Sequence, residues 1–511
     1  MGAAPLADPS CREQAILSDQ PPDLRGATGR AGFLSIFPSI VLPMFLAIVD
    51  QTIVSTALPE IAASLGKVQY MSWVVVGYLV ANTIAAPVYG RLGDLFGRRK
   101  LMLGALVMFG IASVCCALST SMEMLVLSRV LQGLGGGGLI TLSQALISEV
   151  VAPRERVAYQ GYLATVGVTA NAVGPVIGGY LTEHFGWRAI FLVNLPLDAL
   201  GILLLLRLPA SPGLGERRPF DLPGLLLLSG FVAATLIGFS QSQRVTTEGL
   251  SQAAILLAVA GVSLALLLRH EGRTAFPLLP VKLIGKPAIW RSDGLAACHG
   301  AAFVSLLTFI PIYLYVVHRA SPAEIGLLMI PLSCGVGAGS LIASHAVSRT
   351  GRTAIFPSLG LTAATVLLVL VAVLGAQWTT AELSWLLGVV ALLMGPVMGV
   401  VQVTVQGAAS PRVLGAAAAT VQLSRSIGAA VGTGLVSLAL FATLALSDAE
   451  ILARFRDLIQ HGPEALAALA PAERARFDAE VRGAFVAAFV LIAGFTGMGA
   501  ALAWTLPVRR L

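Results

Sequence analysis

Fourteen apolar runs of helical length dominate this 511-residue sequence. They cover about Phe33 to Leu58, Tyr70 to Tyr89, Leu101 to Leu118, Met122 to Ser148, Tyr159 to Leu181, Trp187 to Leu208, Leu222 to Gln241, Leu250 to Leu268, Ser292 to Val317, Ala323 to Val347, Thr353 to Leu374, Leu383 to Gln406, Leu414 to Leu446 and Arg482 to Leu506. A helix that spans a bilayer needs about 20 predominantly apolar residues. Only 12% of the residues are charged, against about 25% in soluble domains. The sequence therefore predicts an all-α integral membrane protein with 14 transmembrane helices.

Short sequence repeats indicate how these helices are grouped. The pair Gly97-Arg98 follows the second run, and Gly351-Arg352 follows the tenth, eight runs later. Two parallel six-helix halves would repeat after six runs, so two helices must be inserted between them. We expect a flexible cytoplasmic tail at 1–32, a first half at 33–208, two inserted helices at 222–268, a cytoplasmic linker at 269–291 and a second half at 292–506.

The basic residues indicate which side of the membrane each loop occupies. If the N-terminus is cytoplasmic, 22 of the 33 Lys and Arg residues fall in cytoplasmic segments and four in short outer loops. Short cytoplasmic segments retain positive charge, so both termini are expected to be cytoplasmic. The net charge of +7 thus reflects membrane edges and does not indicate nucleic-acid binding.

A charged loop after the second run carries the most specific pattern. It reads Gly90-Arg-Leu-Gly-Asp94-Leu-Phe-Gly97-Arg98-Arg-Lys. Gly90 and Gly97 permit a tight turn, and Asp94 can pair with Arg98 or with the positive end of a neighbouring helix. We interpret the loop as a lock on an inner gate; positive-inside anchoring explains its basic residues but not its glycines or its aspartate.

Two membrane segments contain residues suited to proton coupling. Asp50 lies in the first run, and Arg129 and Gln132 lie in the fourth, before a glycine run. A carboxylate in the bilayer must face water, pair or take up a proton, and a buried arginine must be balanced. We therefore expect Asp50 to exchange protons beside Arg129. For Asp50 the alternative is a hydrogen bond between helices. For Arg129 it is an ion pair that only holds helices together.

The fifth run contains Asn171-x-x-Gly174-Pro175-x-x-Gly178-Gly179. Pro175 removes a backbone donor, and the glycines allow close helix contact and bending. A bent packing helix without a transport role is the alternative interpretation.

Further polar residues in the runs are weaker candidates. Asp198, His299 and His345 could relay protons, although a satisfied hydrogen bond is the simpler role for each, and Arg425 is a second buried arginine. We expect Asp293, two residues from Arg291, to belong to a surface cluster.

No pattern in the sequence indicates an enzyme, a cofactor or a metal site. It contains no Gly-x-x-x-x-Gly-Lys-Ser/Thr loop for ATP, no His-Glu-x-x-His for zinc and no Gly-x-Ser-x-Gly nucleophile. The five cysteines lack metal or disulfide spacing, and we interpret them as packing residues.

These motifs together resemble the major facilitator superfamily and, within it, the fourteen-helix drug:proton antiporter branch. Further branch-like elements are Ala57-Leu58-Pro59 after Asp50 and Trp187-Arg188-x-x-Phe191-x-x-Asn194-x-Pro196, which we interpret as structural. The resemblance implies proton-driven export of lipophilic drugs or toxic compounds, cations among them, by alternating access across the bacterial inner membrane. The segment around Pro175 is similar to the antiporter motif, which implies exchange. The coupling ion would be the proton, with no other cofactor.

Two other functions remain open from the sequence. One is export of a single endogenous metabolite or siderophore. The other is a sensor or scaffold that transports nothing and binds a partner through the charged outer loop 447–481. We expect this loop to form an amphipathic hairpin interrupted by Pro463 and Pro471, with a lid or spacer as its simplest role.

Overall fold

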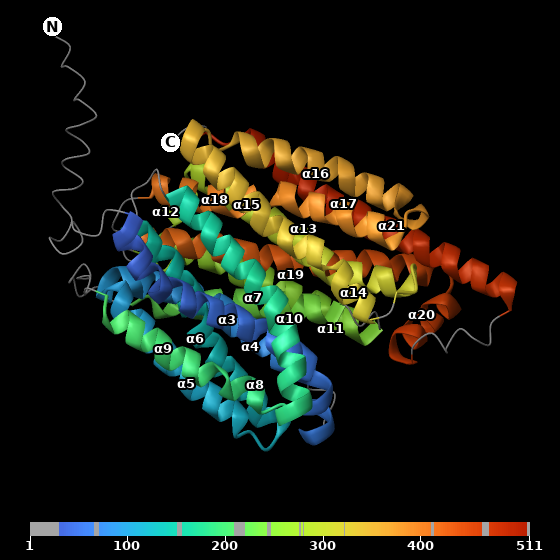
Figure 1. Cartoon of the computed structure of the whole chain (residues 1–511), viewed down its shortest axis with the longest axis horizontal. Coiled ribbons are helices and arrows are strands. Elements are labelled where there is room, and N and C mark those ends of the chain that lie inside the picture. Colours follow the sequence, from blue (N-terminus) through green and yellow to red (C-terminus); the bar gives the residue numbers. More distant parts are fainter. Residues whose placement is uncertain are drawn as a thin grey trace, which may run out of the picture.

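The described part of the chain is an elongated bundle of helices without a strand (Figure 1). The computed structural model describes residues 30–65, 71–150, 156–208, 220–242, 247–274, 277–279, 281–320, 322–409, 413–461 and 470–507. The predicted all-α fold is confirmed. Most of the predicted tail, residues 1–29, lies outside the described residues, and the first helix already begins at Arg30.

The amino-terminal half contains α3 (Arg30–Leu65), α4 (Met71–Phe96), α5 (Arg98–Ala117), α6 (Met122–Val150), α7 (Arg156–Phe185), α8 (Ala189–Leu192) and α9 (Asn194–Leu206). The sixth apolar run, expected as one helix, is divided at Val193 into the short α8 and the longer α9. Within this half α3 packs against α7 and α9, α4 against α6, and α5 against α9.

The carboxy-terminal half contains α13 (Pro287–Val316), α14 (Pro322–Leu328), α15 (Ile330–Thr350), α16 (Ile355–Leu374), the 3-10 turn η2 (Gly375–Gln377), α17 (Thr380–Met394), α18 (Pro396–Ala408), α19 (Leu414–Ser447), α20 (Ala449–His461) and α21 (Pro471–Trp504). Here α13 packs against α19 and α21, α15 against α17, and α16 against α21. These are the contacts of the amino-terminal half, repeated eight apolar runs later.

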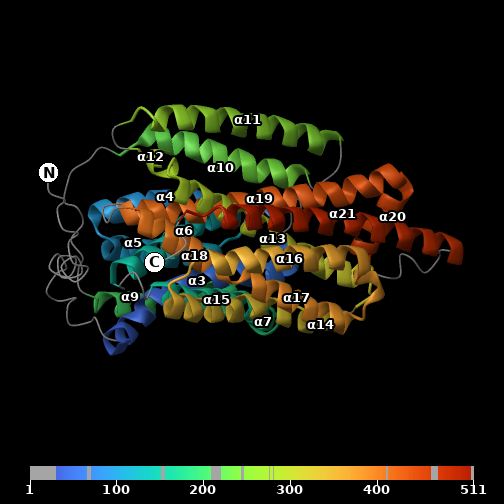
Figure 2. The ribbon, with the colours of Figure 1, turned by 90° about the horizontal axis from the view of Figure 1, so that it is seen from above.

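The helices α10 (Leu222–Ser242) and α11 (Thr247–Glu271) pack against each other between the halves in sequence. Figure 2 shows them side by side along one flank of the bundle. The inner member, α10, contacts α4 of one half and α19 of the other. The short α12 (Val281–Ile284) precedes α13 in the linker.

Thirteen helices of the described chain are long and apolar enough to cross a membrane. The expected fifth span is present as the 30-residue α7, but Gly, Thr, Asn and Tyr residues lower its hydropathy, and it is not among the thirteen. Because α7 packs along α3 and α15, we still predict that it spans the membrane.

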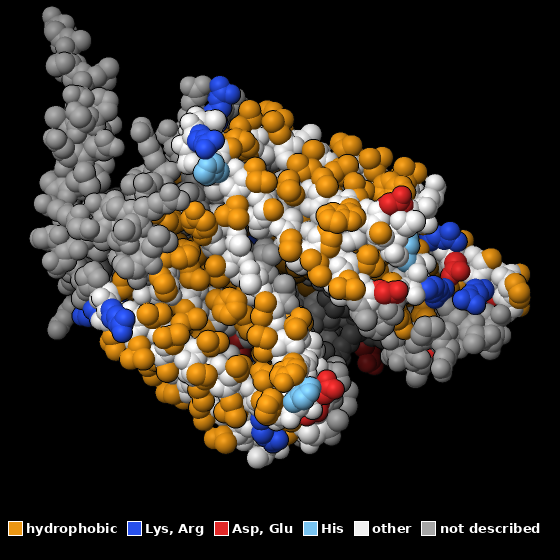
Figure 3. Space-filling view, viewed as in Figure 1, with side chains coloured by type: hydrophobic (Ala, Val, Ile, Leu, Met, Phe, Trp, Pro, Cys, Tyr) orange, Lys and Arg blue, Asp and Glu red, His pale blue; other side chains and the backbone are white. Residues whose placement is uncertain are grey.

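The bundle has two chemically different ends. We call the end with the turns at Gly97 and Gly351 the basic end, and the end with α20 the loop end. Figure 3 shows hydrophobic side chains along the bundle, with charged side chains gathered toward its ends. At the basic end, Ser39 near the start of α3 bonds to Leu204, and Arg291 near the start of α13 bonds to Thr505 after α21. The start of the first described helix and the end of the last one therefore lie at the basic end.

The loop segment 447–481 differs in part from the expected hairpin. The helix α20 is amphipathic, and its buried face packs into the carboxy-terminal half through Ile451, Leu452, Phe455 and Leu458. The last helix begins at Pro471 and not at Arg482, because proline is well suited to the first turn of a helix. Pro463 lies outside the described residues.

Candidate functional site

A buried polar cluster lies inside the amino-terminal half, where α3, α5, α6 and α9 meet. Asp50 on α3 accepts a hydrogen bond from Arg129 Nη1 on α6 at 2.6 Å. The same carboxylate accepts one from Gln132 Nε2 at 2.9 Å and one from Asn194 Nδ2 on α9 at 2.8 Å. Ser113 on α5 accepts a further bond from Gln132 Nε2 at 2.8 Å. The structure thus brings three of the predicted residues together.

Arg129 is held on several sides. Its Nη1 donates to Gln132 Oε1 at 2.6 Å, its Nε donates to the carbonyl of Val74 at 3.4 Å, and its guanidinium lies 4.2 Å from the ring centre of Tyr78. Asp50 is 0% exposed and Arg129 is 1% exposed. A buried ion pair is tolerated only when such additional hydrogen bonds satisfy both charges. The geometry is therefore that of an ionised carboxylate and a charged guanidinium.

The sequence of α6 explains why this arrangement can form. Arg129 and Gln132 are three residues apart and lie on one face of the helix. The glycine run that follows lets α6 approach α4 closely: a Cβ at Gly133 would collide with the carbonyl of Tyr78, and one at Gly137 with that of Asn82. The close approach leaves no gap between α6 and α4, and the buried side chains of Arg129 and Gln132 reach Asp50 on α3.

The predicted gate residues connect the two halves at the basic end. Arg98 Nη2 donates to Asp94 Oδ1 at 2.8 Å. The Asp94 carboxylate also accepts the backbone N–H groups of Gly415 at 3.0 Å and Ala416 at 3.2 Å, in the first turn of α19. These N–H groups have no partner inside their own helix, and the helix dipole there favours a negative charge. Asp94 therefore caps a helix of the opposite half and links the two halves at the basic end.

The two gate glycines have different roles. Gly97 has φ 91° and forms the turn between α4 and α5, as expected. The expectation that Gly90 also lies in a turn is wrong, because it lies inside α4. A Cβ on Gly90 would meet the carbonyl of Gly415 and the side chain of Ala419, so this glycine allows α4 and α19 to touch.

Two glycines of α7, Gly174 and Gly178, allow close contact with α3, the helix that carries Asp50. A Cβ on Gly174 would collide with the Thr52 hydroxyl, and one on Gly178 with the backbone of Ile53. Thr52 turns its hydroxyl back to the carbonyl of Val49 at 3.0 Å, which keeps it compact at this contact.

The remaining residues of that motif do not join the polar cluster. Pro175 lies inside α7, which is helical from Arg156 to Phe185. Gly179 faces open space, and Asn171 is exposed. Gly174 and Gly178 of the motif thus pack against α3. The other three motif residues, Asn171, Pro175 and Gly179, make no contact with Asp50.

The other predicted membrane residues are dispersed. Asp198 is buried on α9, one turn beyond Asn194, and Arg129 forms its ion pair with Asp50 and not with Asp198. His299 on α13 is buried and stacks on Phe303, with ring centres 5.7 Å apart. Arg425 on α19 is half-buried, and its Nε donates to the neighbouring Gln422 side chain at 3.3 Å.

The expectation that Asp293 belongs to a surface cluster is wrong. Asp293 is 7% exposed, and its carboxylate accepts from the Thr420 hydroxyl on α19 at 3.3 Å. Arg291 turns away and donates to the carbonyl of Thr505. Because side chains two residues apart lie on different faces of a helix, their proximity in sequence did not bring them together.

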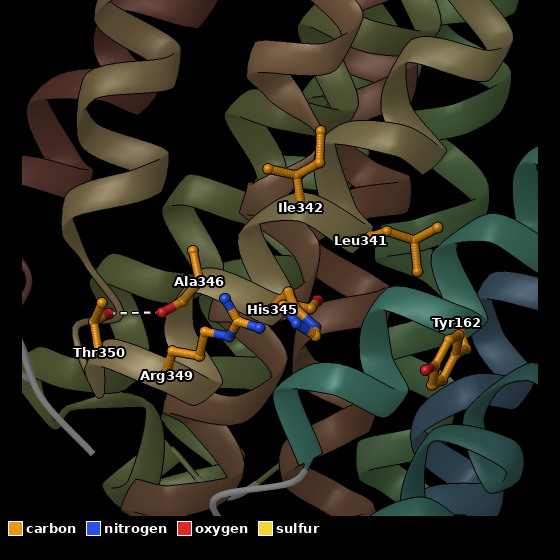
Figure 4. A pocket seen from close by; sticks show the side chains of 8 residues that line it. Tyr162, Leu341, Ile342, His345, Ala346, Arg349 and Thr350 are labelled. Atoms are coloured by element: carbon orange, nitrogen blue, oxygen red, sulfur yellow. Dashed lines mark hydrogen bonds between the residues drawn. The ribbon is translucent and has the colours of Figure 1, made fainter.

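The described residues line two cavities. One, of about 620 Å³, lies between Tyr162 of α7 and the end of α15, and Figure 4 shows His345 and Arg349 along its wall. The other, of about 720 Å³, is an apolar cleft between α4, α6 and α10. Within the described residues, no group of three or more His, Cys, Asp or Glu side chains could hold a metal ion.

Sequence reasoning missed three members of the polar cluster. The sequence indicates a structural role for Asn194 and gives no role to Ser113 or Tyr78. The available signal was the position of Asn194 in an otherwise apolar segment, since such a residue needs a partner in the membrane. Nothing in the sequence indicated Ser113, because single serines are common in membrane helices.

Comparison with known proteins identifies the family. The family model described as Major Facilitator Superfamily matches residues 40–433. An uncharacterized MFS-type transporter of Mycobacterium tuberculosis is 37% identical over 403 residues, which cover 78% of this chain and 58% of the relative. The efflux pump FUS6 of Gibberella moniliformis is 30% identical over 376 residues, or 72% of this chain and 66% of the relative.

The chain therefore spans about three fifths to two thirds of the length of these relatives. A solved structure has the same fold: that of the human organic anion transporter MFSD10 (TETRAN) aligns with a TM-score of 0.62 at 17% identity, covering 95% of this chain and 100% of that chain. The predicted resemblance is confirmed at the level of the superfamily. The chain belongs to the major facilitator superfamily, and it is a multi-pass membrane protein.

Proposed function

We propose that this transporter exports small lipophilic compounds in exchange for protons, as a member of the fourteen-helix drug:proton antiporter branch. The observation that carries this proposal is the buried ion pair of Asp50 and Arg129, 2.6 Å apart in the amino-terminal half. A carboxylate that is fully enclosed, yet held only by hydrogen bonds and one cation, can change its charge by taking up a single proton.

Protonation of Asp50 would loosen the cluster. The neutral acid no longer attracts Arg129, and one of its oxygens becomes a donor that cannot accept from Gln132 or Asn194 in the same way. The positions of α3, α6 and α9 at this point would then change together. Because α3 also packs on the glycines of α7, this change would reach the helix that contacts α15 of the other half.

The contact of α4 with α19 would be the gate of this cycle. The Asp94 cap joins α4 to α19 at the basic end. We propose that this state is closed there and is open or occluded toward the loop end. We further propose that the basic end faces the cytoplasm, in agreement with the positive-inside rule. Alternating access requires that the cap break when the halves rock.

The proton gradient is adequate for such export. One proton that crosses about 100 mV supplies about 2.3 kcal/mol, and each pH unit adds about 1.4 kcal/mol. Together these sustain a gradient of several hundredfold for a neutral substrate, since about 1.4 kcal/mol corresponds to a factor of ten.

Two observations support a lipophilic substrate and export. The cleft between α4, α6 and α10 has about 720 Å³ and is lined almost entirely by apolar side chains, a size typical of small-molecule sites at about 300–1,000 Å³. The Gibberella relative is an efflux pump by name.

The test is proton movement in proteoliposomes that contain the purified full chain. A panel that includes tetraphenylphosphonium, ethidium and neutral lipophilic drugs is added, and the internal pH is recorded. We expect several unrelated lipophilic compounds to release protons. A response to one compound alone would instead indicate an exporter of a single metabolite, and no response to any would indicate the sensor or scaffold.

A further inference from the structure

Two buried oxygens on consecutive turns of α9 lack a hydrogen-bond partner. They are Oδ1 of Asn194 and Oδ1 of Asp198, and no donor in the described part of the chain reaches either atom. The two residues are four apart, and both lie on the buried face of α9. Side chains at this spacing are neighbours, with Cβ atoms about 5–6 Å apart, and the later one leans toward the earlier.

The orientation of the Asn194 amide is fixed by its other neighbour. Its Nδ2 donates to the ionised Asp50 carboxylate at 2.8 Å, and an amide oxygen placed there would be repelled. The amide oxygen of Asn194 is therefore the atom left toward the rest of the pocket. It can only be satisfied by a donor, and an ionised Asp198 has none to offer.

Asp198 lacks what stabilises Asp50. It is 5% exposed, and its Oδ2 lies against Gly110 of α5, where even a Cβ would collide with it. No cation of the described residues is paired with it. The charged groups on the packed helices are Arg30, Asp50 and Glu60 on α3, Arg98, Arg99 and Lys100 on α5, and Arg188 and Arg207 at the ends of the α8–α9 segment. Of these, Arg99 is bound to the carbonyls of Leu205 and Leu206 near the end of α9.

We propose that Asp198 is protonated in this state and donates to Asn194 Oδ1, directly or through one water, so that Asp50 and Asp198 share one exchangeable proton across Asn194. The pair follows a known pattern, in which one carboxylate is held ionised by cations and amides and the other is kept neutral by apolar surroundings. The exchange role rests on the proposed proton antiport; the protonation itself does not.

The proton balance of this relay is simple. When Asp50 gains a proton from the loop end, its charge is lost, and Asn194 can rotate so that its Nδ2 faces Asp198. Asp198 then releases its proton toward the basic end and becomes the carboxylate that accepts from Asn194. One proton has then entered at Asp50 and one has left at Asp198. Transfer of the remaining proton from Asp50 to Asp198, with Asn194 turning back, restores the starting state.

Infrared difference spectroscopy tests this in the full chain in lipid without any substrate. The carbonyl stretch of a protonated carboxylic acid is recorded at neutral pH for the wild type and for Asp198→Asn, an isostere of the neutral acid. We expect the variant to lose one acid band that the wild type has. Asp457→Asn, which changes an exposed carboxylate on α20, should leave all acid bands unchanged.

The relay makes a second, sharper demand. Asp50→Asn mimics protonated Asp50 and leaves Arg129 unbalanced, so Asp198 should ionise and its acid band should lose most of its amplitude. In Asn194→Leu the band should remain but move to higher frequency, because its hydrogen bond is gone. If the wild type and Asp198→Asn have the same acid bands, the proposal is wrong. If the Asp198 band does not change in Asp50→Asn, Asp198 is a buried acid that shares no proton with Asp50, and the relay is wrong.

These outcomes are distinct from those of the transport assay. Chains that move no compound can still show the Asp198 band and its response to Asp50→Asn, which would refute antiport but not the shared proton. Chains that export with protons but lack the band would refute only the relay. If Asn194→Leu does not fold, the two aspartate variants suffice, because each replaces a carboxyl group by an amide of the same shape.

Discussion

At the scale of single residues, Arg129 is the side chain on which the cluster depends most. It is almost fully buried, and the charge that balances it is Asp50 on another helix. Removing one partner of a buried ion pair strands the other, which costs far more than removing both. This asymmetry separates a true ion pair from two polar side chains that happen to be close.

We predict that Arg129→Met destabilises the protein by about 3–5 kcal/mol, and that adding Asp50→Asn recovers a large part of this loss. Thermal unfolding of the detergent-purified chain measures both. The matched control is Arg425→Met, since that arginine is only half-buried and forms no ion pair with a described carboxylate. A double variant no more stable than Arg129→Met would show that the pair is not coupled.

The sequence indicated the charged members of the site but not its neutral ones. Asp50 and Arg129 stand out because ionised groups are rare and costly in membrane helices. Asn194 and Ser113 could not be assigned, since their role depends on the helix crossing that places α5 and α9 beside α3. Asp293 was misplaced because hydropathy locates the end of a span only to within a turn, and this residue lies inside the α13–α19 contact.

At the scale of helices, close contacts without side chains between them decide which surfaces meet. The contact of α3 with α7 depends on Gly174 and Gly178, and that of α4 with α19 on Gly90 and Gly415. The first joins the proposed proton site to α7, and the second joins the two halves at the proposed gate. Motif spacing predicts close approach for Gly174 and Gly178 but not for Gly90 or Gly415, and only the structure shows which helix each one meets.

We predict that Gly174→Ala destabilises the chain by about 1–3 kcal/mol through overpacking against Thr52, and that Thr52→Ala in the same chain relieves it. Gly179→Ala is the control in the same motif, because its Cβ would face open space. Thermal unfolding of the three variants provides the comparison. Because Ala has the higher helix propensity, Gly179→Ala should not destabilise the chain. Equal losses for Gly174→Ala and Gly179→Ala would mean that the contact with α3 does not govern this segment.

Asp94→Asn should weaken the cap on α19 without changing the polar cluster. Asn can still accept a backbone hydrogen bond, but loss of a partly buried negative charge at a helix N-terminus costs up to about 2 kcal/mol, so we expect the closed state to lose up to about thirtyfold in population relative to the open one. Exchange of a transported probe should slow while its equilibrium affinity stays within about twofold. Asp448→Asn, at a surface ion pair with Arg476, is the control. A large loss of affinity with normal exchange would contradict the gate role.

At the scale of the whole molecule, both the fold and the repeat follow from the pattern of apolar runs. The all-helical bundle agrees with what the sequence indicated, and the helix contacts of the second half repeat those of the first half eight runs later. The position of α20 did not follow, because an amphipathic segment after a span can lie on the membrane, in solvent or on the protein. Its apolar face is covered by the carboxy-terminal half, as the burial of Phe455 shows.

We predict that the loop end faces outward and the basic end faces the cytoplasm. In a chain without its native cysteines, Ala475→Cys on α21 should react with an impermeant maleimide in intact cells, and Ser348→Cys on α15 should react only after lysis. Both positions are exposed, so reactivity reports the side of the membrane. The reverse labelling pattern would invert the topology and the proposed direction of transport.

The most direct measurement of the central claim compares uphill with downhill transport in wild-type and Asp50→Asn proteoliposomes. The probe is a compound that releases protons from the wild-type chain, and its movement is followed with and without an imposed pH gradient. We expect Asp50→Asn to retain downhill exchange and to lose accumulation against the gradient, because the amide keeps the shape of the acid but cannot change charge. Asp457→Asn should behave as the wild type. Accumulation by Asp50→Asn at the wild-type level would show that the coupling proton is not bound at this site.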